Sequence, residues 1–297
     1  MKRNDKPYSG ESRLHFRFVQ YGGNTYPDGI IPELIEVAGH LDKESIKDLP
    51  NYSLHTEYSY GKRVLSSALI KQFPELCNAN KDGVPQLWKS NIWAEQFAEF
   101  VLTLTNKHVA PKVIEIHPPF SDYCDIGQFT ERYIVFEKLI HNTYQNTEIV
   151  IENRAGSVYH GGKFIVGKAT EIATLCEKIR KNNINLGVVL DFPQLLTAEN
   201  IKTDAFDQKK YLFAIDTIYP YQSVIKGIHI WGKKKNASGR WVAHCGTLDT
   251  YIENPNDKAV FISGIKKICS DGQSRFFVPE VNSGTDDSNA VINDVLK

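Results

Sequence analysis

Five short apolar segments of this chain each end on a single ionisable side chain. In chain order they are VIEIH, IVIE, GVVLD, IKGIH and RFFVPE, which end on His117, Glu152, Asp191, His229 and Glu280. Short runs rich in β-branched residues are typical of strands buried on both faces, as in a parallel sheet. A carboxylate at the end of such a strand is costly to desolvate unless something pairs with it. The pattern therefore predicts a buried parallel sheet whose strand ends form a site.

Helical patterns alternate with these strands, which favours repeated β/α units. We expect further strands in residues 13–23 and 51–58, and helices in residues 61–73, 87–108, 129–144, 168–183, 204–219 and 258–272. No GxGxxG or Walker loop is present, which disfavours a nucleotide-binding doubly wound sheet. The chain of 297 residues is predicted to be one (β/α)8-type TIM barrel domain spanning residues 1–297.

The N-terminal part of this barrel is less regular in the sequence. Seven strands can be assigned, and an eighth must lie in residues 24–50, where IIPELIEVAGHL is compatible with a short helix. The barrel is thus expected to be irregular, or even seven-stranded, near the N-terminus.

Composition narrows the classes of partner. Lys plus Arg equals Asp plus Glu, 35 each, so no global positive field indicates a nucleic-acid partner. No apolar run approaches the roughly 20 residues of a membrane span, and the polar start of the chain does not resemble a signal peptide. Five scattered cysteines give no disulfide framework. We therefore expect a cytoplasmic protein without a membrane partner; its oligomeric state is left open.

Strand parity predicts where the terminal polar residues point. Side chains two residues apart share a face of a strand, so each terminal residue and the residue two before it should face the barrel interior. These pairs are Ser53 and His55, Glu115 and His117, Val150 and Glu152, Val189 and Asp191, Gly227 and His229, and Val278 and Glu280. The intervening Ile, Val and Leu residues should face the helices. Six polar side chains would then converge on the C-terminal mouth, where barrel active sites lie.

Three imidazoles and three carboxylates in one pocket suit Zn, Mn, Fe or Co. A bound cation would also keep a buried carboxylate such as Asp191 ionised. We therefore predict divalent metal ions as the cofactor, with zinc favoured and manganese or iron as alternatives.

Several motifs resemble the xylose-isomerase-like barrel superfamily, and within it the endonuclease IV branch (AP endonuclease family 2). The resemblance covers about residues 51–285 and consists of IENRAG, GVVLDFPQ, IKGIHIWGKKKNASGRWVAHCGTLD, VPEVNSG and IHPPF. Carried over by position, it implies one metal held by Glu152, Asp191, His229 and Glu280. It implies a second metal held by His117 and His55, with Glu152 bridging the two ions.

The chain departs from this branch at the third metal. Gln194 stands where the family has a His three residues after the Asp, and Val242 stands where it has an Asp two residues before His244. The four-residue core is also shared with sugar isomerases and epimerases of the superfamily. The Glu152–Asn153 pair also resembles multinuclear-iron oxygenases.

These observations favour a metal-dependent hydrolase that acts on a phosphodiester or phosphorylated substrate, possibly DNA. In it, Glu152, Glu280 and Asp191 would be the catalytic residues. The alternative is a sugar isomerase or epimerase with one metal, in which Glu152 and Glu280 exchange protons on opposite faces of a carbon; an oxygenase is a third possibility. The candidates for substrate binding are Trp231, Lys233, Arg240 and His244 on the segment after His229. The glycine-rich segment RAGSVYHGGK, with His160, is the candidate lid.

Overall fold

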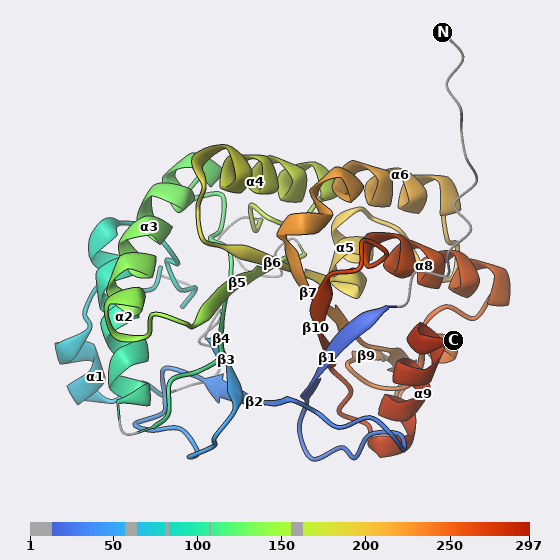
Figure 1. The fold of residues 1–297 in the computed structure, drawn as a ribbon, viewed down its shortest axis with the longest axis horizontal. Helices are drawn as coiled ribbons and strands as arrows, with labels where there is room; N and C mark the ends of the chain where they lie inside the picture. Colours follow the sequence, from blue (N-terminus) through green and yellow to red (C-terminus); the bar gives the residue numbers. More distant parts are fainter. Residues whose placement is uncertain (1–13, 57–63, 81–82, 107, 156–162) are drawn as a thin grey trace, which may run out of the picture.

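The computed structural model describes residues 14–56, 64–80, 83–106, 108–155 and 163–297. Its centre is a closed barrel of eight parallel strands in the order β1–β10–β7–β6–β5–β4–β3–β2 (Figure 1). The α/β barrel predicted from the sequence is therefore confirmed. The barrel strands are β1 (His15–Gln20), β2 (Leu34–Gly39), β3 (Tyr52–Thr56), β4 (Val113–Ile116), β5 (Glu148–Glu152), β6 (Gly187–Asp191), β7 (Ile225–Ile230) and β10 (Ser274–Pro279).

Helices surround much of the barrel, and several match the predicted segments. In Figure 1, α2 and α3 lie on one side of the strands, α4 and α6 on the next, and α8 and α9 beyond β10. No helix stands between β1 and β3 along the chain, so this part of the barrel has loop connections only. The helices are α1 (Ser67–Gln72), α2 (Asn91–Thr105), α3 (Ile126–Thr143), α4 (Ala169–Asn182), α5 (Phe192–Ala198), α6 (Gln208–Ile218), α7 (Leu248–Tyr251), α8 (Pro255–Ile268), α9 (Thr285–Leu296) and the 3-10 helix η1 (Tyr219–Val224).

The eighth strand lies in the region that was hard to assign. Residues 34–39 form β2, which pairs with β1 on one side and with β3 on the other. The expected short helix is therefore wrong, and the barrel is neither open nor seven-stranded. The segment LIEVAG contains β-branched Ile35 and Val37, but the polar Glu36 between them obscured the strand pattern. Glu36 proves important below.

Two separate apolar layers confirm the predicted parity of the strands. A small interior cluster fills the barrel and contains Val19, Leu34, Val113, Val150, Val189, Phe276 and Val278. The alternate residues of the same strands belong to the large outer cluster under the helices, and they include Ile114, Ile116, Ile149, Ile151, Val188, Leu190, Ile228 and Ile230. The interior cluster forms the floor beneath the polar strand ends.

Some elements near the mouth were not predicted. Helix α5 begins directly after β6, and an antiparallel hairpin of β8 (Lys233–Lys235) and β9 (Trp241–Ala243) follows β7. In the described part of the chain, no helix combines the length and apolar character needed to cross a membrane.

Candidate metal centre

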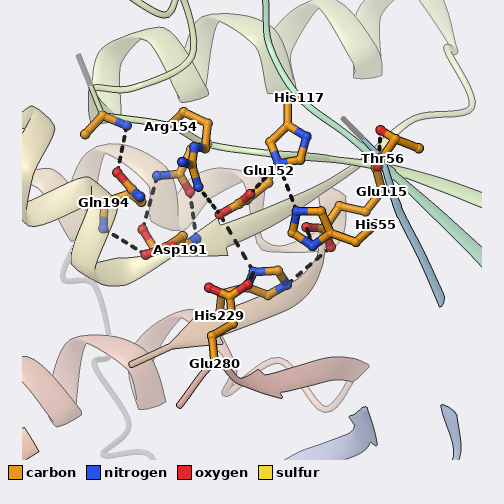
Figure 2. A network of polar contacts seen from close by, with 12 residues as sticks. His55, Thr56, Glu115, His117, Glu152, Arg154, Asp191, Gln194, His229 and Glu280 are labelled. Atoms are coloured by element: carbon orange, nitrogen blue, oxygen red, sulfur yellow. Dashed lines mark hydrogen bonds and ion pairs between the residues drawn. The ribbon is translucent and has the colours of Figure 1, made fainter. Parts of the chain in front are cut away.

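All six predicted ligands converge at the C-terminal mouth of the barrel. Figure 2 shows their side chains pointing toward one another from strands on opposite sides of the barrel. Potential ligand atoms lie no more than 4.8 Å apart in three groups, of which two contain Glu152 and the third consists of Glu36, His55 and Glu280. The first group is Glu152, Asp191, His229 and Glu280; the second is His55, Glu115, His117 and Glu152. Glu152 belongs to both groups and lies between them.

The first group has the spacing of ligands around one ion. His229 Nδ1 is 3.2 Å from Glu280 Oε1 and 3.7 Å from Glu152 Oε1. Ligands about 2.0–2.1 Å from a tetrahedral ion are roughly 3.3 Å from one another. All four side chains are at least 95% buried, since their exposed fractions are between 0% and 5%. Bulk water therefore cannot compensate their charges.

The second group brings two imidazoles to the other oxygen of Glu152. His117 Nε2 is 2.8 Å from Glu152 Oε2, and His55 Nε2 is 3.2 Å from His117 Nε2. Two ring nitrogens at that distance either share a proton or direct lone pairs at a common ion. Glu115 completes the group from the same strand as His117.

Asp191 is held by four hydrogen bonds with three residues. Its backbone N–H donates to Asn153 Oδ1 (2.8 Å), and Asn153 Nδ2 donates to the carbonyl oxygen of Asp191 (3.1 Å), which locks the ends of β5 and β6 together. The carboxylate caps α5 by accepting the Gln194 N–H (2.8 Å), and its other oxygen accepts the Trp231 indole N–H (2.8 Å). Part of the reason for a carboxylate at this strand end is therefore a helix cap that the sequence analysis did not predict.

Two strained backbone positions support the site. Trp88 and His244 have positive φ angles of 58° and 56°, which residues other than glycine seldom adopt. The buried Trp88 indole donates to the carbonyl oxygen of His117 at 2.7 Å. His244 stacks on Trp231 at 4.4 Å between ring centroids and places Nδ1 3.4 Å from Glu280 Oε2. Such strain at a cluster of titratable residues is a feature of functional sites.

Three charged residues of the site were missing from the predicted ligand set. Glu115 lies two residues before His117 on the same face, so parity alone could have included it. Glu36 lies 3.3 Å from His55 Nδ1, but it is on β2, which was taken for a helix. Arg154, at 3.5 Å from Glu152 Oε1, lies two residues after the end of β5, beyond the reach of strand parity.

Negative charge dominates this part of the barrel. In the described region, five carboxylates meet here, and the Arg154 guanidinium contacts one of them, Glu152. Burial raises the pKa of Asp191 well above its usual range, and the neighbouring charges of Glu152 and Glu280 raise it further. Burial also raises the pKa of Glu115. Both shifts favour the neutral form of the carboxyl group, and a bound cation would oppose them.

The pKa values of Glu152, His55 and His117 are also shifted by their surroundings. Burial opposes ionisation of Glu152, but Arg154 and the imidazole contacts outweigh it and hold the pKa of Glu152 well below its usual range. Burial disfavours the charged form of His55 as well, yet Glu115 and Glu36 raise its pKa to about 10. His117 has less compensation, and burial lowers its pKa to about 3.

The donor set fits divalent metal ions. Several buried atoms of the first group make no hydrogen bond within the described residues: Glu152 Oε1, His229 Nδ1 and Glu280 Oε2. Buried polar atoms without partners are rare, and ligand atoms aimed at a common point explain them. Mixed imidazole and carboxylate donors suit Zn, Mn, Fe and Co, and the geometry does not choose among them.

Gln194, the residue that departs from the endonuclease IV pattern, has a structural role here. Gln194 Oε1 accepts the Ala155 N–H at 3.1 Å, and the Gln194 backbone N–H is the donor that Asp191 caps. Gln194 therefore joins the segment after β5 to α5.

The predicted substrate-binding residues are distributed along the hairpin. Trp231 is only 3% exposed, so its main contacts are Asp191 and the His244 ring. Lys233 is partly buried near the ring of Tyr251, and Arg240 lies at the exposed end of the hairpin. Their roles toward a substrate stay predictions. The predicted lid, with His160, lies mostly outside the described residues.

Comparisons with known proteins give limited information. No family model matches the chain, and no curated protein matches it. Among solved structures, a probable 3-DHS dehydratase from Bacillus anthracis is 11% identical, with 84% of this chain and 77% of that chain covered and a TM-score of 0.41. A xylose isomerase domain protein from Alicyclobacillus acidocaldarius is 12% identical, with 82% and 77% covered and a TM-score of 0.38. Similarity this low says nothing about the reaction, so the function is inferred from the residues of the site.

Proposed function

We propose that this protein is a metal-dependent hydrolase with a dinuclear centre, acting on a phosphodiester or another phosphorylated substrate. One observation carries the proposal: Glu152 belongs to both ligand groups, with Oε2 toward His117 and Oε1 toward His229. A carboxylate in this position can bridge two ions, which in two-metal hydrolases lie about 3.5–4 Å apart. The motif resemblance to the endonuclease IV branch supports the same assignment.

The ions would supply a water molecule of lowered pKa and positive charge for the reacting phosphoryl group. The protein's own residues would orient this chemistry. Trp231 and the N-terminus of α5 hold Asp191 from two sides, so its carboxylate cannot rotate freely. Glu280, which faces His244 at 3.4 Å, is the carboxylate best placed to transfer a proton at the open side of the site. Arg154 adds a fixed positive charge for an anionic substrate.

The isomerase or epimerase alternative would use the first ligand group with a single ion. In that mechanism, Glu152 and Glu280 would act on opposite faces of one carbon. A single metal would leave His55 and His117 without a catalytic role, and for this reason we favour the dinuclear proposal.

Metal content and substrate choice test this proposal together. We expect protein saturated with Zn or Mn to hold two ions per chain by elemental analysis. It should hydrolyse a generic phosphodiester such as bis(4-nitrophenyl) phosphate and should not interconvert aldoses and ketoses. Asp191→Asn should abolish hydrolysis, and Asp216→Asn on the exposed side of α6 is the matched control. One ion per chain together with aldose isomerisation would establish the alternative.

A further inference from the structure

Glu115 is a buried carboxylate with an imidazole on each side. It lies on β4, is 3% exposed, and its backbone carbonyl oxygen accepts the Thr56 hydroxyl at 2.7 Å. Its Oε2 atom is 3.2 Å from His229 Nε2, and its Oε1 atom is 3.4 Å from His55 Nδ1. The side chain of Glu115 thus lies in the barrel interior between His55 on β3 and His229 on β7 (Figure 2).

Glu115 approaches one nitrogen of each ring at an ion-pair distance, and these nitrogens make no hydrogen bond within the described residues. The other nitrogen of His229, Nδ1, faces Glu280 Oε1 at 3.2 Å. The other nitrogen of His55, Nε2, faces His117 Nε2 at 3.2 Å. Each imidazole therefore has one nitrogen directed at a proposed ion position and one directed at the same carboxylate.

We propose that Glu115 is a positioning residue that orients His229 and His55 together and so links the two ion positions; this rests on the metal function proposed above. An imidazole ligand must present a lone pair at one nitrogen and carry its proton on the other. A carboxylate that accepts this second N–H fixes the tautomer and the ring orientation, and it raises the basicity of the ligand. Because a carboxylate has two oxygens, Glu115 can serve one ring with each of them.

Glu36 provides the matched comparison. Its Oε1 atom is 3.3 Å from His55 Nδ1, nearly the same distance as that of Glu115. Of the two imidazoles, Glu36 contacts only His55, and its carboxylate also lies within 4.8 Å of a Glu280 ligand atom. Because it does not contact His229, its removal should affect chiefly the ion position of His55. Replacing Glu115 should affect both positions, since glutamine keeps one acceptor oxygen and turns an N–H group toward the second ring.

The experiment compares wild type, Glu115→Gln and Glu36→Gln by competitive titration with Zn²⁺ and by elemental analysis, with circular dichroism to verify folding. We expect Glu115→Gln to keep two ions per chain, both bound about 10–100-fold more weakly. Glu36→Gln should weaken chiefly one ion. In Zn-loaded wild type, ¹⁵N spectra of the histidine side chains should show the proton on Nε2 of His229 and on Nδ1 of His55.

The other outcomes separate the two proposals. Loss of one ion from Glu115→Gln, with the other bound normally, would make Glu115 a direct ligand and overturn the positioning role. Two ions at wild-type affinity, or the opposite tautomers in the wild-type spectrum, would overturn it too. If wild type binds no ion at all, the proposed function fails and the inference fails with it.

Discussion

The substitution Glu152→Gln tests the centre of the site directly. It keeps the size of the side chain and removes the charge that both ligand groups share. The carboxylate is fully buried and contacts Arg154 Nη1 at 3.5 Å and His117 Nε2 at 2.8 Å. Its effect should therefore depend strongly on whether metal is bound.

In metal-free protein the residues around Glu152 already stabilise its charge. At an effective dielectric constant of about 20, the attraction to Arg154 at 3.5 Å is about 5 kcal/mol. Together with the imidazole contacts it holds the pKa of Glu152 well below its usual range. Glu152→Gln should therefore lower the free energy of unfolding by about 3–5 kcal/mol even without metal. With metal at a hundred times its Kd, each ion stabilises the wild type by about 2.7 kcal/mol.

Thermal unfolding with and without Zn²⁺ or Mn²⁺ measures this difference. Each bound ion should raise the wild-type Tm by roughly 5–10 °C, and the increase should vanish in Glu152→Gln. Glu148→Gln is the control, since it makes the same change on the same strand at a side chain that is 47% exposed. A variant at Glu152 that keeps two ions and the full Tm increase would refute the shared-ligand assignment.

Three further predictions follow from individual contacts. Metal binding should release protons and strengthen as pH rises, because coordination must displace the proton of His55. Burial lowers the pKa of His55, but Glu115 and Glu36 outweigh it and raise the pKa to about 10. Calorimetry in buffers of different ionisation enthalpy measures the number of protons released. Asp271→Asn should cost about 3 kcal/mol at neutral pH because it removes the partner of the buried Arg275, at 2.7 and 2.9 Å. Since this contact lowers the pKa of Asp271, the wild-type advantage should be complete above the ordinary aspartate pKa and disappear as pH falls through the lowered one. Gly264→Ala should cost about 1–3 kcal/mol, because a Cβ there would overlap the ring of the buried Tyr211, with Cε1 at 2.7 Å.

Each of these predictions has a control and a contrary result. A binding enthalpy that is independent of the buffer would contradict the proton release. Asp216→Asn, which breaks the exposed pair with Lys267, should change stability by less than about 1 kcal/mol. A stability loss of less than about 1 kcal/mol in Asp271→Asn would show that the buried Arg275 does not depend on this carboxylate. Gly23→Ala, with no atom within 4 Å of its added Cβ, should be tolerated; an equal loss at both glycines would refute the packing argument.

The sequence predicted the convergence of the site because strand parity is a strong constraint. Once β5, β6 and β7 were assigned as parallel strands, their alternate residues had to share the barrel interior, and the last of these had to meet at the mouth. The same rule separates Val150 and Val189 in the interior from Ile151 and Leu190 under the helices.

The contacts between side chains could not be predicted in this way. Parity places Glu115 in the interior but cannot show that its oxygens reach His229 across the barrel, since that depends on the closure of the sheet. Glu36 was missed because it lies within β2, a strand of only six residues whose sequence is also compatible with a short helix. The cap that Asp191 provides could not be foreseen because α5, which begins at Phe192, was not predicted from the sequence.

These contacts also show why Asp191 needs more than hydrogen bonds. Its two oxygens accept N–H groups from Gln194 and Trp231, and both donors are neutral. Neutral donors reduce the cost of burying a charge but do not cancel it, which agrees with the raised pKa of this carboxyl group. Either a proton or a cation must supply the missing positive charge. Because Glu152 and Glu280 face the same point, a divalent ion can compensate several carboxylates at once, whereas protons must neutralise them one by one. On the proposed metal function, we expect the ion to be favoured at neutral pH and the proton to replace it only as the pH falls.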